Sequence, residues 1–195
     1  SSLDTITFWT NNKIINAKLI YIPGGDQRRF MDICRNHKMS TIIKKAYENG
    51  STIAGTSAGA AIMSGEMITG TALKYEEYHP TFRTLEKDNM ELAEGLGLLP
   101  ENFIIDQHFI RRSRYNRLLT AVIEDPSLTG LGIEESTAAI VNKDSIEVVG
   151  NYQIIVFQNR SRQSKKQNGL LGEEDIKLSV YLPGEKFPLT KFYGK

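Results

Sequence analysis

The segment STIAGTSAGAAIMSGE, residues 51–66, constrains the fold of this chain more than any other. Its apolar residues 52–54 form a short strand-like run that ends in the G-x-S-x-G pattern of residues 55–59, and a helix-compatible run of small residues follows. This pattern works where a strand turns sharply into a helix, and Thr, Ala and Gly suit a turn too tight for bulky side chains. The segment therefore predicts a strand–turn–helix unit with Ser57 at its apex.

At such an apex the hydroxyl of Ser57 is lifted above the end of the sheet, and the backbone N–H of Ala58 lies beside it. A serine held in this way attacks a carbonyl carbon while the neighbouring N–H stabilises the oxyanion. The same pattern also arises by chance, and a turn rich in Gly, Ser and Ala is equally well a simple tight connection. The motif alone does not decide between catalysis and connection, so its partners in the fold are needed.

Strand-like and helix-like segments alternate through the first two thirds of the chain. The expected strands are residues 18–22, 51–55 and 103–106, and the expected helices are residues 4–17, 26–35, 41–49 and 111–125. Asp26 and Ser40 are N-cap candidates, Gly50 suits a helix stop, and Pro126 ends the last helix. Strands that alternate with helices predict an α/β fold, a three-layer sandwich with a mostly parallel central sheet covered on both faces.

The pattern changes from residue 130 onward. Short, turn-separated strands are expected at residues 131–133, 137–141, 145–149 and 153–157, and we expect them to be antiparallel. Residues 159–175 are polar and charged, and we expect a mobile surface loop there. No linker or repeat divides the chain, so residues 1–195 are expected to form one domain with a sizeable core.

Composition excludes several classes of protein. A formal net charge of +1 gives no electrostatic attraction to nucleic acid or to an anionic membrane. The single cysteine, Cys34, cannot form an internal disulfide or a cysteine-rich metal site, and no metal or cofactor is expected. No apolar run approaches the length of a membrane span, and no signal peptide is visible. We expect a cytoplasmic protein, although secretion stays open because the chain starts at Ser1 without a methionine.

A catalytic serine needs a base, and the chain has three histidines. His37 follows an expected helix end, where a solvated role suits it, and His79 lies in a polar stretch. His108 follows the expected strand 103–106, and ligands of α/β sheets collect at the carboxyl ends of strands. A lone histidine is more often structural, but elimination and position favour His108 as the partner of Ser57.

The third member of such a site is a carboxylate that orients the imidazole. Glu134 and Glu135 follow the apolar run 131–133, which is another expected strand end. Alternate residues of a strand face opposite sides, so spacing alone does not choose between the two. A pair of surface glutamates is the alternative.

A glycine turn supplies a candidate for the second oxyanion donor. The residues PGGDQ at 23–27 end a strand and open a helix, and the N–H of Gly25 is the natural donor. An ordinary strand–helix turn is the alternative.

Four arginines, at positions 111, 112, 114 and 117, crowd the expected start of the helix after His108. Cations at a helix N-terminus are unfavourable with the macrodipole. The cluster therefore suggests that these residues bind a carboxylate or pair with an acid such as Asp106, rather than forming only a solvated helix face.

Four motifs in one order resemble a known family. They are GTSAGA at 55–60, PGGDQ at 23–27, DQHFIRRSRYNRLL at 106–119 and GLGIEESTA at 130–138. Together they closely resemble the cyanophycinases of serine peptidase family S51, a family that also contains the aspartyl dipeptidases (peptidase E). The resemblance covers residues 13–158, and the long DQHF-x-x-R-x-R-x-x-R run favours a cyanophycinase over peptidase E.

The resemblance implies a role for each matching residue. Ser57 matches the nucleophile, His108 the general base and Glu135 the acid that orients it. Family members commonly have Asp-Glu where this chain has Glu134-Glu135. The substrate-pocket positions of the family fall on Gln27, Asp106, Gln107, Arg112, Arg114 and Arg117.

The resemblance also implies a substrate and an assembly. Family members are compact α/β proteins, usually dimers, and they release β-Asp-Arg dipeptides from cyanophycin, a poly-aspartate backbone with arginine on each side-chain carboxylate. A homodimer acting on a β-linked Asp-Arg peptide is therefore implied. An aspartyl dipeptidase and a catalytically silent peptide-binding homologue are the alternatives.

This chain departs from the family at both ends. The first strand–helix units of the family, with a glycine-rich first strand, are absent from it. We expect that incomplete coverage or processing accounts for this, rather than a natural start at Ser1. The segments 159–175 and 183–195 have no counterpart in the resemblance.

Overall fold

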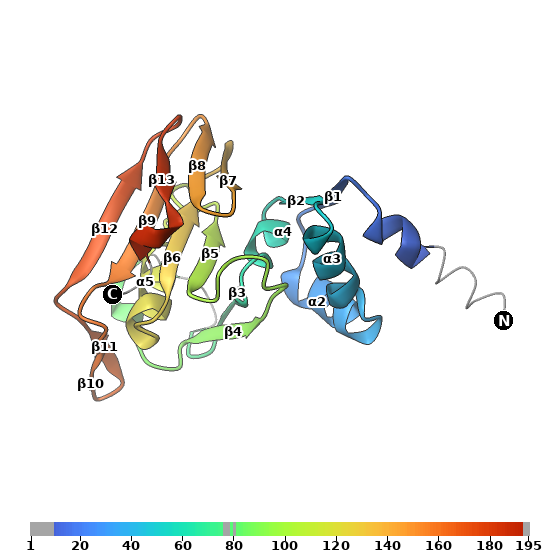
Figure 1. The fold of residues 1–195 in the computed structure, drawn as a ribbon. Coiled ribbons are helices and arrows are strands. Elements are labelled where there is room, and N and C mark those ends of the chain that lie inside the picture. The colour runs from blue at the N-terminus through green and yellow to red at the C-terminus, as the bar shows by residue number, and fades with distance from the viewer. Residues whose placement is uncertain (1–9, 76–78, 80, 193–195) are drawn as a thin grey trace.

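The structure is a computed structural model and describes residues 10–75, 79 and 81–192. Its helices are α2 (Gln27–Asn36), α3 (Met39–Glu48), α4 (Ala58–Ala61) and α5 (Tyr115–Glu124), with 3₁₀ turns η1 (Phe82–Thr84) and η2 (Leu189–Phe192). Its strands are β1 (Leu19–Ile22), β2 (Thr52–Gly55), β3 (Glu66–Ala72), β4 (Met90–Glu94), β5 (Phe103–Gln107), β6 (Thr129–Ile133), β7 (Thr137–Val141), β8 (Ser145–Gly150), β9 (Ile154–Asn159), β10 (Lys165–Gln167), β11 (Leu170–Gly172), β12 (Ile176–Tyr181) and β13 (Lys186–Pro188). Figure 1 shows α2, α3, β1 and β2 at one end of the molecule and most strands, with α5, at the other.

The β-rich end is built on a four-stranded sheet in the order β12-β9-β6-β5. Its strands β5 and β6 are parallel, whereas β9 runs antiparallel to β6 and to β12. A second sheet, β13-β8-β7, is antiparallel throughout. Only a short turn separates β7 from its partner β8, and a short turn joins paired strands only when they are antiparallel, whereas a parallel neighbour needs a long crossover. The antiparallel strands expected after residue 130 are confirmed, except that β6 also pairs in parallel with β5.

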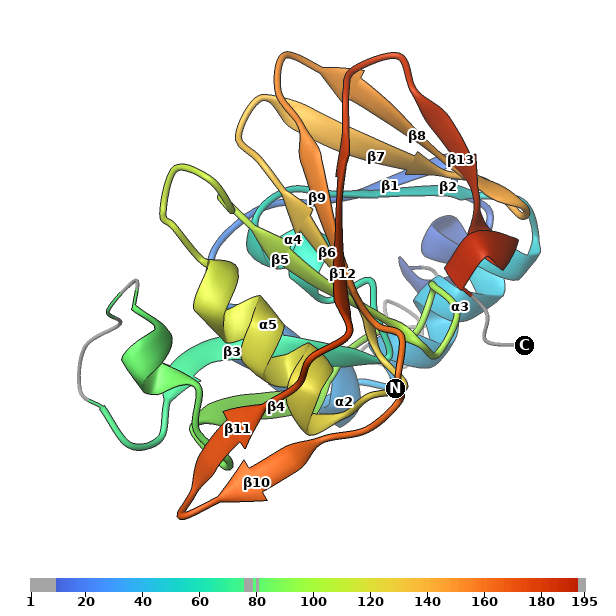
Figure 2. The ribbon, with the colours of Figure 1, turned by 90° about the vertical axis from the view of Figure 1, so that its left-hand side faces the viewer.

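The four-stranded sheet is covered differently on its two faces. On one face, Phe103 and Ile105 of β5 pack in the same cluster as Ile146 of β8, from the second sheet. On the other face, Ile104 packs with Leu118 of α5. This alternation follows from the two-residue period of a strand. Figure 2 shows α5 and the β7-β8-β13 sheet as separate layers, so the mixed α/β class is confirmed, but one outer layer is a sheet instead of helices.

Parallel pairing is less extensive than expected from the sequence. In the described part of the chain it is limited to β1 with β2 and β5 with β6. Strands β1 and β2 form a sheet of their own, and β5 packs against α4 and β3 without pairing with either. The central sheet is not mostly parallel, because β9 runs antiparallel to both β6 and β12 and only β5 and β6 are parallel.

The helical end has its own small core, which contains Ile22, Met31, Ile43, Ile62, Met67 and Leu96. Asp26 caps α2 as predicted, and its carboxylate accepts the N–H of Arg29 at 3.0 Å. Gly50, with φ of 96°, follows the end of α3 in the left-handed conformation that ends many helices. The prediction that Ser40 caps α3 was wrong: the left-handed Lys38 is the N-cap, and Ser40 lies within the first turn.

Two other segments differ from the sequence prediction. Helix α5 begins at Tyr115, not at residue 111, because residues 108–114 form a succession of turns. The polar segment 159–175 is not a plain loop but contains the hairpin β10–β11. Leu171 in this hairpin is buried, and its N–H donates to the carbonyl of Leu85 at 3.0 Å.

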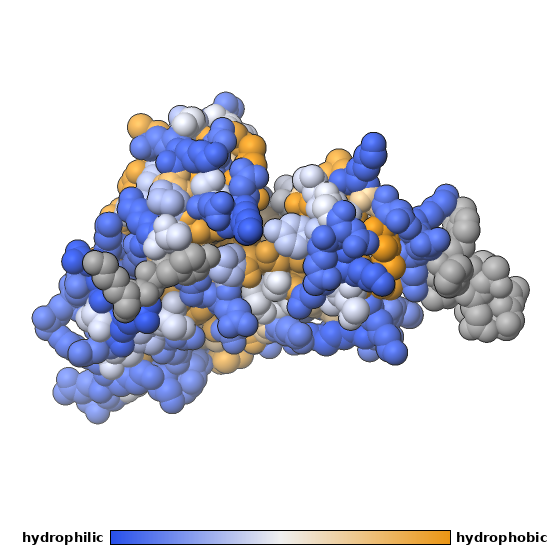
Figure 3. Space-filling view, viewed as in Figure 1, coloured by the Kyte–Doolittle hydropathy of each residue, from blue (hydrophilic) through white to orange (hydrophobic). Residues whose placement is uncertain are grey.

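The ends of the chain are described in part. Residues 10–15 are helical, while the rest of the helix expected over residues 4–17, at residues 4–9, lies outside the described residues. In the tail, β13 pairs with β8, and Phe192 packs edge-to-face on Phe103 with ring centroids 5.7 Å apart. No helix within the described residues is long and apolar enough to cross a membrane. Figure 3 shows that most of one face is hydrophilic, with hydrophobic residues in smaller patches between the two ends of the molecule and on each end.

Gly132 of β6 provides a test of this packing. A Cβ placed on Gly132 would lie 2.3 Å from Cδ1 of Phe109, the residue that follows His108. Gly132→Ala should lower the free energy of unfolding by about 1–3 kcal/mol, because the buried ring must shift to make room. Gly65→Ala is the control, since nothing lies within 4 Å of its Cβ, and it should change stability by less than about 0.5 kcal/mol. Equal losses for the two variants in urea denaturation would contradict the packing.

Candidate active site

Ser57 occupies a strained turn between β2 and α4. Its φ of 54° and ψ of −117° lie outside the regions that L-residues usually adopt. The turn is made possible by small neighbours: a Cβ on Gly24 would lie 3.2 Å from Cβ of Ser57, and a Cβ on Gly59 would lie 2.2 Å from the carbonyl oxygen of Ile22. The strand–turn–helix unit predicted from the sequence is present, with α4 only one turn long.

His108 lies directly after β5 and faces this serine. Its Nε2 is 2.8 Å from Oγ of Ser57, a normal hydrogen-bond distance. Like Ser57, His108 has a positive φ, 51°, so the chain turns abruptly at the strand end. The imidazole and the hydroxyl thus come from the ends of two different strands.

Glu135 completes a chain of hydrogen bonds. Its Oε1 lies 2.8 Å from Nδ1 of His108. A carboxylate only accepts hydrogen bonds, so Nδ1 carries the proton and Nε2 keeps a lone pair that can accept the hydrogen of Ser57. This arrangement allows the imidazole to remove the proton from the serine hydroxyl. Nε of Arg111 lies 3.4 Å from Oε2, on the other side of the carboxylate.

The adjacent Glu134 has different contacts from Glu135. Its side chain is buried, and its Oε2 accepts the backbone N–H groups of Ile110 and Arg111. The two glutamates therefore act on different parts of the same turn: Glu135 contacts the imidazole of His108, and Glu134 contacts the backbone after it.

Two amides near Ser57 are available as hydrogen-bond donors. Among the described residues, neither the N–H of Gly25 nor that of Ala58 donates to a backbone or side-chain acceptor. Gly25 has φ of 144°, which favours glycine, and its Cβ position is open to solvent. Gln27, the first residue of α2, is instead engaged: its Nε2 donates to the carbonyls of Ile68 and Thr69 at 3.0 and 2.9 Å.

Asp106 forms a buried charge network with two of the predicted arginines. Only 1 % of Asp106 is exposed, and both its carboxylate oxygens bind Arg117, which is itself buried. Nη1 of Arg114 is 3.6 Å from the same carboxylate, and it donates to the backbone and side-chain oxygens of Gln107 at 2.8 and 2.9 Å. A buried carboxylate requires such pairing, because an unpaired charge in the interior is strongly unfavourable.

The arginine cluster is therefore not a single patch at a helix start. Arg111, Arg112 and Arg114 lie in the turns before α5, and Arg117 lies within its first turn. Arg111 and Arg112 are exposed, whereas Arg117 is buried against Asp106. Of the two roles predicted for the cluster, pairing with Asp106 accounts for Arg117.

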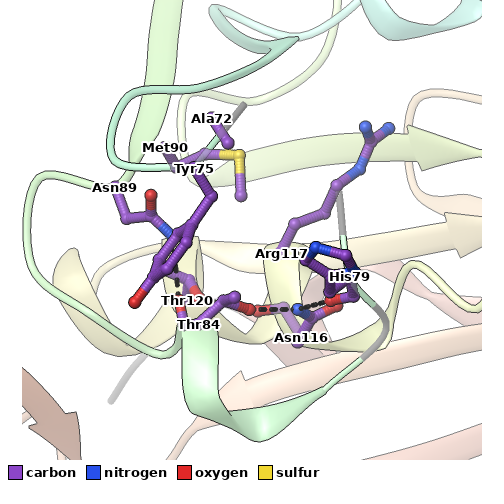
Figure 4. A pocket seen from close by; sticks show the side chains of 9 residues that line it. All are labelled: Ala72, Tyr75, His79, Thr84, Asn89, Met90, Asn116, Arg117 and Thr120. Atoms are coloured by element: carbon purple, nitrogen blue, oxygen red, sulfur yellow. Dashed lines mark hydrogen bonds between the residues drawn. The ribbon is translucent and has the colours of Figure 1, made fainter. Parts of the chain in front are cut away.

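The other histidines lie elsewhere. His37 is exposed at the C-terminal end of α2, where its N–H bonds the carbonyl of Ile33. His79 lines a small cavity with Tyr75, Asn116 and other residues, and neither Ser57 nor His108 contributes to it (Figure 4). Its backbone carbonyl accepts a hydrogen bond from Asn116.

An open groove begins at the glycine turn. It is lined by Gly25, Asp26, Gln27, Arg28, Arg29, Asp32, Thr69 and Thr71. Sequence reasoning missed the charged members of this set, although the residues DQRR directly after the two glycines offered a signal. Nη1 of Arg28 pairs with Glu91 of β4 at 2.9 Å, so the groove wall links α2 to the β3–β4 pair.

Other reactive groups are set apart from this site. Burial raises the pKa of the Cys34 thiol, which keeps the sulfur protonated and weakly nucleophilic. Within the described residues, no cluster of His, Cys, Asp and Glu side chains is arranged to hold a metal ion.

Comparisons with known proteins agree with this geometry. A cyanophycinase of Trichormus variabilis is 32% identical over 177 residues, which are 87% of this chain and 56% of the relative. A peptidase E of Shewanella denitrificans is 25% identical over 158 residues, 77% of this chain and 61% of that protein. The chain thus spans about half the length of the curated relatives that it matches.

Solved structures support the fold. The crystal structure of a peptidase from an acI-B1 Actinobacterium superimposes with a TM-score of 0.63 and 21% identity, covering 92% of this chain and 62% of that one. The sequence profile of peptidase family S51 matches residues 6–149, which include Ser57, His108 and Glu135. This match extends over most of the chain, and the chain belongs to peptidase family S51.

Proposed function

We propose that the protein is a serine-type exopeptidase that hydrolyses β-aspartyl-arginine linkages and releases β-Asp-Arg dipeptides from cyanophycin. The observation that carries this proposal is the unbroken line of hydrogen bonds from Ser57 through His108 to Glu135. Nucleophile, base and orienting acid are recognised by this geometry and not by chain order. The similarity to cyanophycinases supports the choice of substrate.

In the proposed mechanism Oγ of Ser57 attacks the scissile carbonyl carbon. His108 takes the hydroxyl proton at Nε2 and returns it to the leaving amine, while Glu135 stabilises the imidazolium through Nδ1–H. The amides of Gly25 and Ala58 donate to the oxyanion. Water then attacks the acyl group on Ser57, with His108 again acting as the base.

The substrate carries both signs of charge, and so does the proposed binding surface. The buried Asp106 is already paired with Arg117, so its role is to hold Arg117 and Arg114 in place. We assign the substrate carboxylate to Arg114, together with Gln107, to which Arg114 donates hydrogen bonds, and the nearby exposed Arg112. For the substrate guanidinium we assign the exposed acids of the groove beyond Gly25, Asp26, which also caps α2, and Asp32, which also pairs with Arg35 at the surface.

An aspartyl dipeptidase is the second candidate, and the similarity to peptidase E favours it. Such an enzyme would cut after an N-terminal aspartate and would use the same serine, histidine and glutamate. A homodimeric assembly and a cytoplasmic location, which the family resemblance and the sequence suggest, belong to the same proposal.

Replacing the nucleophile tests the proposal first. Ser57→Ala should lower the hydrolysis rate of a β-Asp-Arg substrate by roughly 10⁴- to 10⁶-fold, as in other triads, while the melting temperature stays close to that of the wild type. Ser127→Ala, at an exposed serine beyond α5, is the control and should keep full activity. Substantial turnover by Ser57→Ala would sink the assignment.

The three histidines should behave differently. His108→Ala should be about as inactive as Ser57→Ala, because the two residues act as a unit. His37→Ala and His79→Ala should stay within a few-fold of the wild type, since neither touches Ser57. If His79→Ala were as inactive as Ser57→Ala, another base would be required.

Charge matching should govern substrate choice. A charge-assisted contact contributes about 1.5–3 kcal/mol, so its loss should lower kcat/KM by roughly ten- to a hundred-fold. We expect β-Asp-Arg to be preferred over α-Asp-Arg and over β-Asp-Ala by about this factor. Arg114→Ala should raise KM for substrates with a free aspartate carboxylate and have much less effect on amidated ones.

Arg160→Ala, at an exposed arginine paired with Asp175, is the matched control for Arg114→Ala and should change nothing. Equal kcat/KM for the α- and β-linked pairs would instead point to the aspartyl dipeptidase.

A further inference from the structure

The turn that carries His108 is tied to the strand end that carries Glu135. Three successive amides after His108 donate to two successive residues of the other segment. The N–H of Phe109 bonds the carbonyl of Ile133 at 3.2 Å, and those of Ile110 and Arg111 bond Oε2 of Glu134, the latter at 2.9 Å. The carboxylate of Glu134 is thus one of two anchors that fix the turn relative to β6.

We propose that Glu134 is a positioning residue for His108, acting through the backbone of residues 110 and 111. This inference rests on the proposed function, in which His108 is the base. Because Glu134 and Glu135 are adjacent, one holds the backbone after the imidazole while the other holds the imidazole itself. The spacing between Nδ1 of His108 and Oε1 of Glu135 therefore depends on the hydrogen bonds that Glu134 accepts from the backbone.

The backbone conformation of His108 requires support from hydrogen bonds such as those to Glu134. A histidine with φ of 51° adopts a backbone region that costs energy for a residue with a side chain. Such a conformation persists only where the surroundings determine it. The hydrogen bond from the N–H of Arg112 to the carbonyl of His108, at 3.0 Å, is local, whereas the bonds to Ile133 and Glu134 come from another strand end.

The chemistry at Glu134 suits an anchor. Its side chain is 8 % exposed, and a carboxylate that accepts backbone N–H groups forms charge-assisted bonds stronger than neutral ones. Without it, the amides of Ile110 and Arg111 lose their acceptor in a partly buried site. Arg111 joins the two glutamates, since its N–H binds Glu134 and its Nε lies 3.4 Å from Glu135.

Two variants test the inference in the full chain. Glu134→Ala removes the acceptor, and Glu134→Gln keeps an oxygen but loses the charge. We expect kcat on β-Asp-Arg substrates to fall roughly ten- to a hundred-fold for Glu134→Ala and about three- to ten-fold for Glu134→Gln, as expected for lost charge-assisted and neutral hydrogen bonds. KM should stay within about three-fold, because we assign Glu134 no contact with the substrate, so its loss should not weaken substrate binding.

The control separates positioning from stability. Asp125→Ala removes a carboxylate that also accepts two hydrogen bonds, at the exposed C-terminal end of α5, where it binds the N–H and hydroxyl of Ser127 at 2.9 and 2.7 Å. It should lower the melting temperature without changing kcat. Unchanged kcat in folded Glu134→Ala would overturn the inference. If that variant does not fold, Glu134→Gln decides, and wild-type kcat in it would have the same meaning.

A second readout keeps this inference separate from the proposed function. The rate at which a fluorophosphonate acylates the serine depends on activation by His108 and needs no peptide substrate. It should fall by the same factors as kcat in the two Glu134 variants. A wild type that is labelled but cleaves no β-Asp-Arg substrate would overturn the proposed function alone. Equal labelling rates in wild type and Glu134 variants would overturn this inference alone.

Discussion

The site depends on how closely three backbone segments approach one another around Ser57. A Cβ on Gly55 would lie 2.1 Å from the carbonyl oxygen of Gly59, and one on Gly59 would lie 2.2 Å from that of Ile22. Only glycine allows β1, β2 and α4 to meet at this separation. The turn holds Ser57 in a conformation that costs about 1–3 kcal/mol, and the buried side chains of Ile22 and Ile62 pack the elements that impose it.

Parallel pairing explains why distant residues meet. In β1–β2, Ile22 is level with Gly55, and in β5–β6, Gln107 is level with Ile133. The segments that leave these strand ends carry the glycine turn, Ser57, His108 and the two glutamates. Within each pair the two carboxyl ends lie level, as at the ligand sites of α/β proteins. The two pairs belong to different sheets, and the packing of α4 against β5 brings Ser57 to His108. The buried Asp106–Arg117 pair then fixes α5 to β5 near the carboxyl end of that strand.

Strand ends and the cap of α2 could be predicted from the sequence, because neighbouring residues determine them, whereas the cap of α3 was predicted wrongly at Ser40. Asp26 caps α2, and His108 follows β5 as its apolar run indicates. Features set by distant contacts could not be predicted. Helix α5 starts late because Glu134 of another segment binds the amides of the preceding turn. The polar segment 159–175 forms a hairpin in which Leu171 is buried and its N–H binds the distant carbonyl of Leu85. The extent of parallel pairing and the choice between Glu134 and Glu135 also depend on distant contacts, and neither could be predicted from the sequence.

The central claim is that Ser57 is the nucleophile activated by His108. Peptide mapping by mass spectrometry, after reaction of the purified protein with a fluorophosphonate, identifies the acylated residue directly. The account predicts a single adduct on Ser57, within the peptide that contains GTSAG, and no adduct on Ser57 in His108→Ala under the same conditions. An adduct on another serine with Ser57 unmodified, or equal labelling of Ser57 without His108, would contradict it.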